Sequence, residues 1–211
     1  MRDELFHVGG RSPLHHATLS GNTELVRFLL DEGADLNVED NHIKTAYHYA
    51  AGHGFIPILE MLLDAKDGKD VINRRYEGSP LHEATQSNHV AAVKLLLRAG
   101  AHIDPPADII QTTPLHLAAR LGSHEIAQLL IDHGADACKR YEFPYESPLQ
   151  IATVEGHETV VLTLLNYMTE VRTILFTQSP TLLTPCNINR LIKCSKQWSG
   201  PSKWLQATIV T

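Results

Sequence analysis

The sequence is short of cysteine, of aromatic residues and of long apolar runs. Its 211 residues include three cysteines, Cys138, Cys186 and Cys194, and none of them stands in a CxxC pair. They form neither the ligand pairs of a zinc site nor an even disulfide framework, so reduced thiols are expected. Reduced thiols favour a location in the cytoplasm, and also in the nucleus, over secretion.

Segments that would target the chain to a membrane are lacking too. The longest largely apolar stretch, residues 160–176, is interrupted by Asn166, Glu170 and Arg172, whereas a spanning helix needs about 20 apolar residues. The first four residues, Met1 to Glu4, lack the apolar core of a signal peptide. No membrane insertion is expected.

Motifs of catalysis are not found either. There is no GxSxG elbow, HExxH helix, GxGxxG turn or Walker loop, and Gly68-Lys69 lacks the preceding glycine that a phosphate loop requires. We therefore predict a protein that is not an enzyme, with no catalytic residues, no cofactor and no metal. One alternative stays open: a regulatory fragment of a larger enzyme whose catalytic domain lies outside this chain.

The charge is divided unevenly along the chain. Residues 171–211 hold five basic residues and no acidic one, while residues 1–170 hold the other 13 basic residues and all 24 acidic ones. The first 170 residues thus carry a net charge of −11, and so acidic a surface repels phosphate. No nucleic acid is expected among the partners.

What the sequence does contain is one pattern repeated five times. Its first residues are Ser12, Thr45, Ser79, Thr113 and Ser147, at intervals of 33, 34, 34 and 34 residues. Ser and Thr are good helix N-caps, and the proline that follows four of them suits the first helical position, where a missing N–H costs nothing. Each pattern predicts two helices too short to be stable alone.

The fourth copy shows the whole unit. Its first helix ends at Gly122, its second helix begins near Glu125, and Gly134 closes the unit in a position that favours a left-handed residue. The second copy departs most, because Ala46 and Tyr47 replace the usual Pro and Leu. In the third copy Asn88 replaces the inter-helix glycine, a mild change since asparagine tolerates the left-handed conformation.

This period and this helix-pair pattern resemble the ankyrin repeat. The resemblance implies an all-α ankyrin-repeat solenoid, in which helix-turn-helix repeats are joined by β-hairpin loops. We expect a monomer with an array over residues 1–170, its repeats starting near residues 7, 40, 74, 108 and 142. A basic C-terminal tail of low order, residues 171–211, is expected to follow.

Thirteen histidines raise the question of a metal site. Four of them occupy the same place, three residues after an N-cap: His15, His48, His82 and His116. In ankyrin-like arrays this histidine hydrogen-bonds the N-cap and the neighbouring hairpin. A structural role is favoured over metal binding, because metal ligands converge on one point and do not form a regular row.

The resemblance implies a non-catalytic scaffold or adaptor that binds a partner protein through the concave face of the array. Hairpin tips and the exposed ends of the first helices supply that face. The candidate protein-binding residues are Asn41, His42, Lys44, His53, Arg75, Tyr76, Gln86, Ser87, Ile109, Ile110, Thr112, Arg120, Leu121, Phe143, Pro144, Glu146, Val154 and Glu155.

The apolar members of this set belong to the fourth and fifth repeats, at Ile109, Ile110, Leu121, Phe143 and Val154. Turns are normally polar, so apolar tips suggest a patch that receives an apolar segment of the partner. The alternative is that these side chains fold back and pack on the adjacent hairpin.

The tail offers one further resemblance. Residues 181–186, Thr-Leu-Leu-Thr-Pro-Cys, resemble the start of the elongin-binding half of a SOCS box, a module that follows ankyrin arrays in one family of ubiquitin-ligase adaptors. Pro185 would interrupt the required helix, and Arg190 stands where an apolar residue is expected. A substrate-recognition subunit of a cullin-RING ligase and an irregular coil therefore both stay open.

Overall fold

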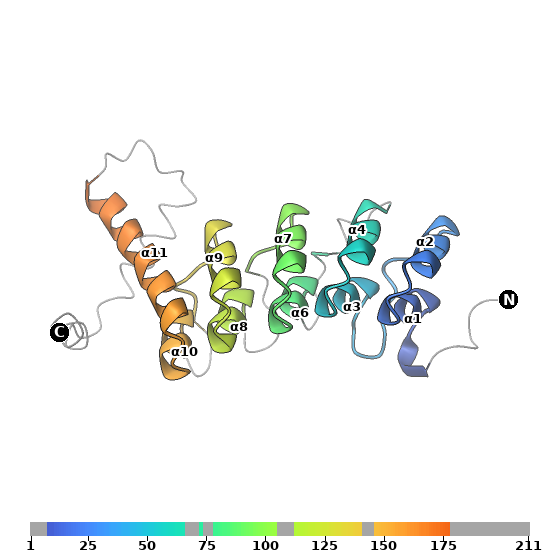
Figure 1. Ribbon diagram of the computed structural model, residues 1–211, viewed down its shortest axis with the longest axis horizontal. Helices are drawn as coiled ribbons and strands as arrows, with labels where there is room; N and C mark the ends of the chain where they lie inside the picture. The colour runs from blue at the N-terminus through green and yellow to red at the C-terminus, as the bar shows by residue number, and fades with distance from the viewer. Residues whose placement is uncertain (1–7, 66–71, 74–77, 105–111, 141–145, 178–211) are drawn as a thin grey trace. The chain divides into compact units, whose positions relative to one another are not determined.

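The computed structural model describes residues 8–65, 72–73, 78–104, 112–140 and 146–177 (Figure 1). These residues contain ten α-helices, a short 3-10 turn at Val8–Gly10, and no β-strand. By its internal contacts the chain divides into two units, Met1–Thr163 and Leu164–Thr211. This division falls inside the last helix.

The helices come in five pairs, one for each sequence repeat. They are α1 (Pro13–Leu19) with α2 (Thr23–Asp31), α3 (Ala46–Gly52) with α4 (Ile56–Asp64), α6 (Pro80–Gln86) with α7 (Val90–Arg98), α8 (Pro114–Leu121) with α9 (His124–Asp132), and α10 (Pro148–Val154) followed by α11 (Glu158–Thr177). Each first helix begins one residue after its expected N-cap, and Pro57 lies in the first turn of α4, where proline is tolerated.

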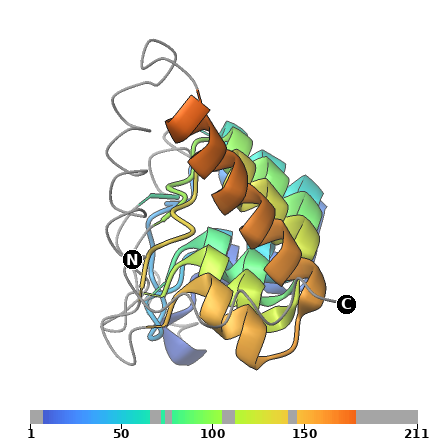
Figure 2. The same ribbon diagram turned by 90° about the vertical axis from the view of Figure 1, so that its left-hand side faces the viewer.

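Within the unit Met1–Thr163 the first and second helices form two parallel rows (Figures 1 and 2). The first row stacks α1, α3, α6, α8 and α10 in order, and the second row stacks α2, α4, α7 and α9. The core between the rows is apolar and fully buried, as at Leu59, Leu81, Leu96, Leu115 and Ile126. The predicted all-α stack of ankyrin-like repeats is confirmed.

The turn inside each repeat needs one left-handed residue. Gly21, Gly54, Gly122 and Gly156 have φ between 67° and 75° at this place, and Asn88 has φ 57° at the same place in the third repeat. The expectation that Asn88 substitutes for a glycine is confirmed.

The repeated histidines connect each repeat to the next. The N-cap N–H donates to the histidine Nδ1, at 3.1 Å from Ser12 to His15 and at 3.0 Å from Thr45 to His48. Because Nδ1 accepts, the ring proton is on Nε2, which donates to a carbonyl of the following loop: His15 to Lys44 (3.0 Å), His48 to Gly78 (3.3 Å), His82 to Thr112 (3.0 Å) and His116 to Lys139 (3.0 Å). The structural role predicted for this row is confirmed.

Tyr47 shows how the second repeat accommodates its departure from the pattern. Its ring is fully buried, and its hydroxyl donates to the carbonyl of Leu62 at 2.6 Å, in the last turn of α4. Carbonyls in a last helical turn lack an intrahelical donor. The tyrosine therefore fills the leucine site and also satisfies a buried carbonyl, and burial raises its pKa so that it stays a donor.

We predict that Tyr47→Phe lowers the free energy of unfolding by about 1–3 kcal/mol, because it leaves that carbonyl unsatisfied. Urea denaturation monitored by circular dichroism measures the change. Ala46→Pro is the companion variant: the other four repeats carry Pro13, Pro80, Pro114 and Pro148 at this position, so it should raise stability by up to about 1 kcal/mol. An unchanged midpoint for Tyr47→Phe would show that the hydrogen bond contributes nothing.

Candidate functional site

The loop between the first and second repeats closes in a tight turn at residues 40–44. The N–H of Asp40 donates to the carbonyl of Lys44 at 3.0 Å, and the N–H of Ile43 donates to the carbonyl of Asp40 at 2.9 Å. The N–H of Asn41 donates to the carbonyl of Gly9 at 3.0 Å, which fixes the turn to the chain that precedes α1. The turn is therefore stabilised by hydrogen bonds within residues 40–44 and by one hydrogen bond to Gly9.

The side chain of Asp40 is the centre of this turn. It is fully buried, and its Oδ1 accepts from the backbone N–H groups of His42 at 2.8 Å and Lys44 at 3.0 Å. Its Oδ2 accepts a short hydrogen bond from the hydroxyl of Tyr49 and lies 3.6 Å from Nε of Arg11. Burial alone would raise the pKa of Asp40, but the hydrogen bonds from Tyr49 and from the backbone outweigh it and lower the pKa.

Ile43 has an unusual backbone in the same turn. Its φ is +56°, a left-handed conformation that β-branched residues rarely adopt, and its side chain is 39% exposed. The hydrogen bonds around Asp40 hold this conformation in place. An apolar side chain is thus presented outward at an energetic cost.

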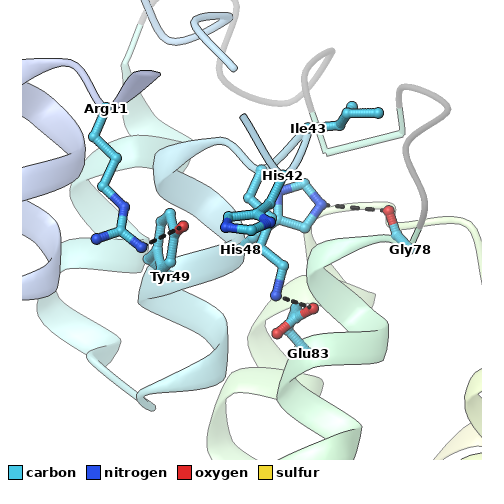
Figure 3. A pocket seen from close by; sticks show the side chains of 8 residues that line it. Arg11, His42, Ile43, His48, Tyr49, Gly78 and Glu83 are labelled. Atoms are coloured by element: carbon cyan, nitrogen blue, oxygen red, sulfur yellow. Dashed lines mark hydrogen bonds and ion pairs between the residues drawn. The ribbon is translucent and has the colours of Figure 1, made fainter. Parts of the chain in front are cut away.

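These residues border a pocket of about 540 Å³, which we call the turn pocket (Figure 3). Its lining comes from the turn, from the residue before the N-cap of α1, from α3 and from the third repeat: Arg11, His42, Ile43, Lys44, His48, Tyr49, Gly78 and Glu83. Arg11 approaches the ring of Tyr49, with 5.3 Å from the guanidinium carbon to the ring centroid, and donates to its hydroxyl at 3.4 Å.

Two further features define what the turn pocket can bind. Nζ of Lys44 lies 2.8 Å from Oε1 of Glu83, and about a third of each side chain stays exposed, so the pair offers both donors and an acceptor. His48 is neutral, because burial lowers its pKa to about 4. Among the described residues, no group of three His, Cys, Asp or Glu side chains could hold a metal ion.

Comparison with known proteins decides the family. The model for ankyrin repeats (3 copies) matches residues 2–75 and 81–174, which is well over half of the chain. The chain belongs to the ankyrin-repeat family.

Several ankyrin-repeat proteins resemble the chain over most of its length. The ankyrin repeat protein nuc-2 of Neurospora crassa is 31% identical over 155 residues, 74% of this chain and 14% of that protein. The mouse B-cell lymphoma 3 protein homolog is 37% identical, over 63% of this chain and 32% of its own length. Human ankyrin repeat and SOCS box protein 14 is 30% identical, over 74% of this chain and 33% of its own length. The chain thus spans a third or less of these relatives.

Ankyrin repeats are in general non-catalytic modules that bind other proteins, and this chain carries them over most of its length. In the part of the chain that the structure describes, no helix combines the length and the apolar character needed to cross a membrane.

The structure brings together two of the predicted binding residues, His42 and Lys44, in the turn pocket. Other predicted residues lie at the carboxyl ends of the first helices, where Val154 is 79% exposed and Leu121 is half-exposed. His53 caps α3, and its ring stacks on Phe55 at 5.4 Å. Gln86, Ser87, Arg120 and Glu155 also lie at the carboxyl ends of first helices. Asn41, Thr112 and Glu146 lie in the loops. Outside the described residues lie Arg75, Tyr76, Ile109, Ile110, Phe143 and Pro144.

Sequence reasoning missed Arg11, Ile43, Tyr49 and Glu83. Ile43 had a usable signal, since an isoleucine inside the turn Asn-His-Ile-Lys is as unexpected as the apolar tips of the fourth and fifth repeats. Tyr49 and Glu83 share one repeat position, four residues after their N-caps. Arg11 carried no signal of its own, because its role depends on contacts between different repeats.

Proposed function

We propose that the chain binds an extended segment of a partner protein in the turn pocket, with an apolar side chain of that segment against Ile43. The observation that carries this proposal is the positive φ of an exposed isoleucine. Strain of this kind costs about 1–3 kcal/mol and tends to cluster at binding sites. Glycine or asparagine would adopt this φ with less strain, so an isoleucine here points to a role in binding.

The polar lining suits a peptide backbone. An extended segment brings N–H donors and carbonyl acceptors in alternation. The exposed parts of Lys44 and Glu83 can pair with one of each, and Arg11 adds donors at the other side of the turn pocket. Because the charges of Lys44 and Glu83 already balance, the proposed ligand is a mixed polar and apolar segment, and not a strongly acidic or basic one.

Ile43→Gly separates binding from folding. Glycine adopts a positive φ without strain, so the variant should unfold at a higher urea concentration, by about 1 kcal/mol in the free energy of unfolding. The same variant removes the apolar contact, so it should recover its partner from cell lysate at least fivefold less well, as measured by quantitative mass spectrometry of affinity-purified chains.

Val154→Ser is the matched control, because it removes an exposed apolar side chain at the carboxyl end of α10, in the other predicted binding region. It should leave partner recovery unchanged. If Val154→Ser abolishes recovery and Ile43→Gly does not, the partner binds the carboxyl ends of the first helices and the turn pocket is not the site.

A second candidate function rests on the tail. Human ankyrin repeat and SOCS box protein 14 is 30% identical over 74% of this chain, and human ankyrin repeat and SOCS box protein 3 is 37% identical over 47% of it. The SOCS-box-like residues 181–186 lie outside the described residues. Such a tail would make the chain a substrate-recognition subunit of a cullin-RING ubiquitin ligase.

This candidate predicts that the full chain co-purifies with elongins and that deletion of residues 177–211 abolishes their recovery while an array partner is retained. Immunoblotting of affinity-purified chains measures both. Absence of elongins from the full-length sample would rule this candidate out and leave the proposal for the turn pocket unaffected.

A further inference from the structure

The five repeats allow each position to be compared with its equivalents, and one helix face differs. The residue thirteen places after the N-cap is fully buried in four repeats, at Ile58, Ala92, Ile126 and Val160. In the first repeat the same place holds Leu25, which is 42% exposed. Leu25 thus occupies a position that is buried in the other repeats, but no described residue packs over it.

Two further residues of α2 are also more exposed than their equivalents in later repeats. Seventeen places after the N-cap, Leu62, Leu96 and Leu130 are fully buried, while Leu29 is only partly buried. Sixteen places after it, Phe28 is 58% exposed, whereas its equivalents in the second to fourth repeats are partly buried. Leu25, Phe28 and Leu29 lie at i, i+3 and i+4 and therefore form one stripe, which we call the outer face of α2.

The packing of the second row explains the difference. Within the unit Met1–Thr163, α4 packs on α2, α7 on α4, and α9 on α7, and α2 is the end member of that row (Figure 1). Its inward side is already used, since Val26 is fully buried. The outer face of α2 therefore corresponds to the side that in later repeats packs on the preceding second helix.

Glu24 lies at the edge of this face, and the equivalent residue of the fourth repeat, Glu125, forms an ion pair. Between the third and fourth repeats, Nζ of Lys94 lies 3.3 Å from Oε1 of Glu125, an ion pair that joins α7 to α9. Glu125 stands twelve places after its N-cap, and Glu24 stands at the same place in the first repeat and is exposed. A helix that packs on α2 in the way that α7 packs on α9, with a basic residue at the position of Lys94, would place that residue beside Glu24.

We propose that the outer face of α2, with Glu24 at its edge, is an open stacking interface that accepts one further ankyrin repeat ahead of Ser12, in the array's own register. The interface is continuous with those already formed by α4, α7 and α9. The second helix of the added repeat would cover Leu25, Phe28 and Leu29 and place a Lys or Arg beside Glu24. This inference is independent of the turn pocket.

The chain's own third repeat supplies the probe. A copy of residues 79–101 is fused directly before Arg2 of the full chain, so that the copied Ser79 precedes Ser12 by 33 residues, the spacing that separates Ser12 from Thr45. The copy includes a lysine equivalent to Lys94. In the original array the second helix of the third repeat, α7, packs on α9 of the fourth repeat. The residues of α9 equivalent to Glu24, Leu25, Phe28 and Leu29 are Glu125, Ile126, Leu129 and Leu130.

In the fused chain we expect amide hydrogen exchange in α1 and α2 to slow at least tenfold and the urea midpoint to rise. Leu25→Ser with Phe28→Ser should lower the midpoint of the original chain only slightly, since both side chains are about half-exposed there, and should cancel the gain in the fused chain. Leu162→Ser, which removes an exposed leucine elsewhere, is the matched control and should not affect the gain.

Three results would overturn the proposal. The first is a fused chain whose α2 exchanges as fast as before, or whose gain survives the double substitution. The second is a dimer of the original chain by light scattering that the double substitution dissociates, because the face would then bind a second copy. The third is a faster exchange of α2 after deletion of residues 1–7, because the chain's own N-terminus would then cover the face.

Discussion

Lowering the pH from 7 to about 4.5 should destabilise the array by several kcal/mol, with most of the loss between pH 6.5 and 4. His48 and His116 are almost fully buried, and burial is the main reason that the pKa of each falls from an ordinary value of 6.5 to about 4. The unfolded chain takes up these protons near pH 6.5, while the folded chain takes them up only near pH 4. Stability is therefore complete above pH 6.5 and is lost as the pH falls through this window.

The size of the effect follows from the shift. One pKa unit corresponds to 1.36 kcal/mol, so each histidine contributes at most about 3 kcal/mol to the loss. The hydrogen bonds give the structural reason. Nδ1 of His48 accepts from the N–H of Thr45, and a proton on that nitrogen would turn the contact into two opposed donors.

The control for this experiment is present in the fifth repeat. Gln150 stands where the other repeats have histidine, and its Oε1 accepts from the N–H of Ser147 at 3.0 Å. Glutamine thus keeps the N-cap contact and does not titrate. Urea denaturation at several pH values should give a steeper pH dependence for the original chain than for the variant with His48→Gln and His116→Gln. Parallel curves would show that these two histidines do not couple folding to pH.

Asp40→Asn should cost about 2–4 kcal/mol in the free energy of unfolding. The buried carboxylate accepts from two backbone N–H groups and from Tyr49, and it lies beside Arg11. An asparagine keeps one oxygen but must turn its NH₂ group towards the donors of Tyr49 and Arg11 or towards the backbone. An NH₂ group facing one of these donors leaves a buried hydrogen-bonding group unsatisfied, which is the costly case.

Asp35→Asn is the matched control, because Asp35 also accepts a backbone hydrogen bond, from Asn37 at 2.8 Å, but is exposed. It should change stability by less than about 0.5 kcal/mol. Thermal and urea denaturation of both variants measure the difference. Equal costs would mean that the Asp40 network does not stabilise the turn, and the strained backbone of Ile43 would then need another explanation.

The parts of the fold that sequence reasoning predicted correctly are those that local chemistry determines. In four repeats a Ser or Thr followed by proline favours a helix start, so the starts at Ser12, Ser79, Thr113 and Ser147 could be placed without any tertiary contact. Asn88 could be assigned a left-handed backbone because it stands where the other repeats have glycine, and asparagine tolerates that conformation. The histidine row was predictable because one spacing recurs four times.

The candidate site could be predicted only in part, because its side chains come from three repeats and the contacts between them do not recur along the array. The contact of Asp40 with Arg11 and Tyr49 joins the first repeat to the second, and the pair of Lys44 and Glu83 joins the second to the third. No periodic pattern indicates such contacts. His42 and Lys44 were predicted from their place at a hairpin tip, whereas the positive φ of Ile43 follows from the closed turn around it.

The histidine row also has a consequence for how such a chain can change in evolution. His15, His48 and His82 each donate to the carbonyl of the residue just before the next N-cap, so each of these three repeats brings its own donor and the repeat that follows offers the acceptor. Deleting or duplicating a whole 33- or 34-residue segment joins a donor to an equivalent acceptor and leaves each link intact. A deletion of half a repeat would break a link and unpair a buried ring. The array can therefore lengthen or shorten by recombination in whole repeats, while its loops diverge independently.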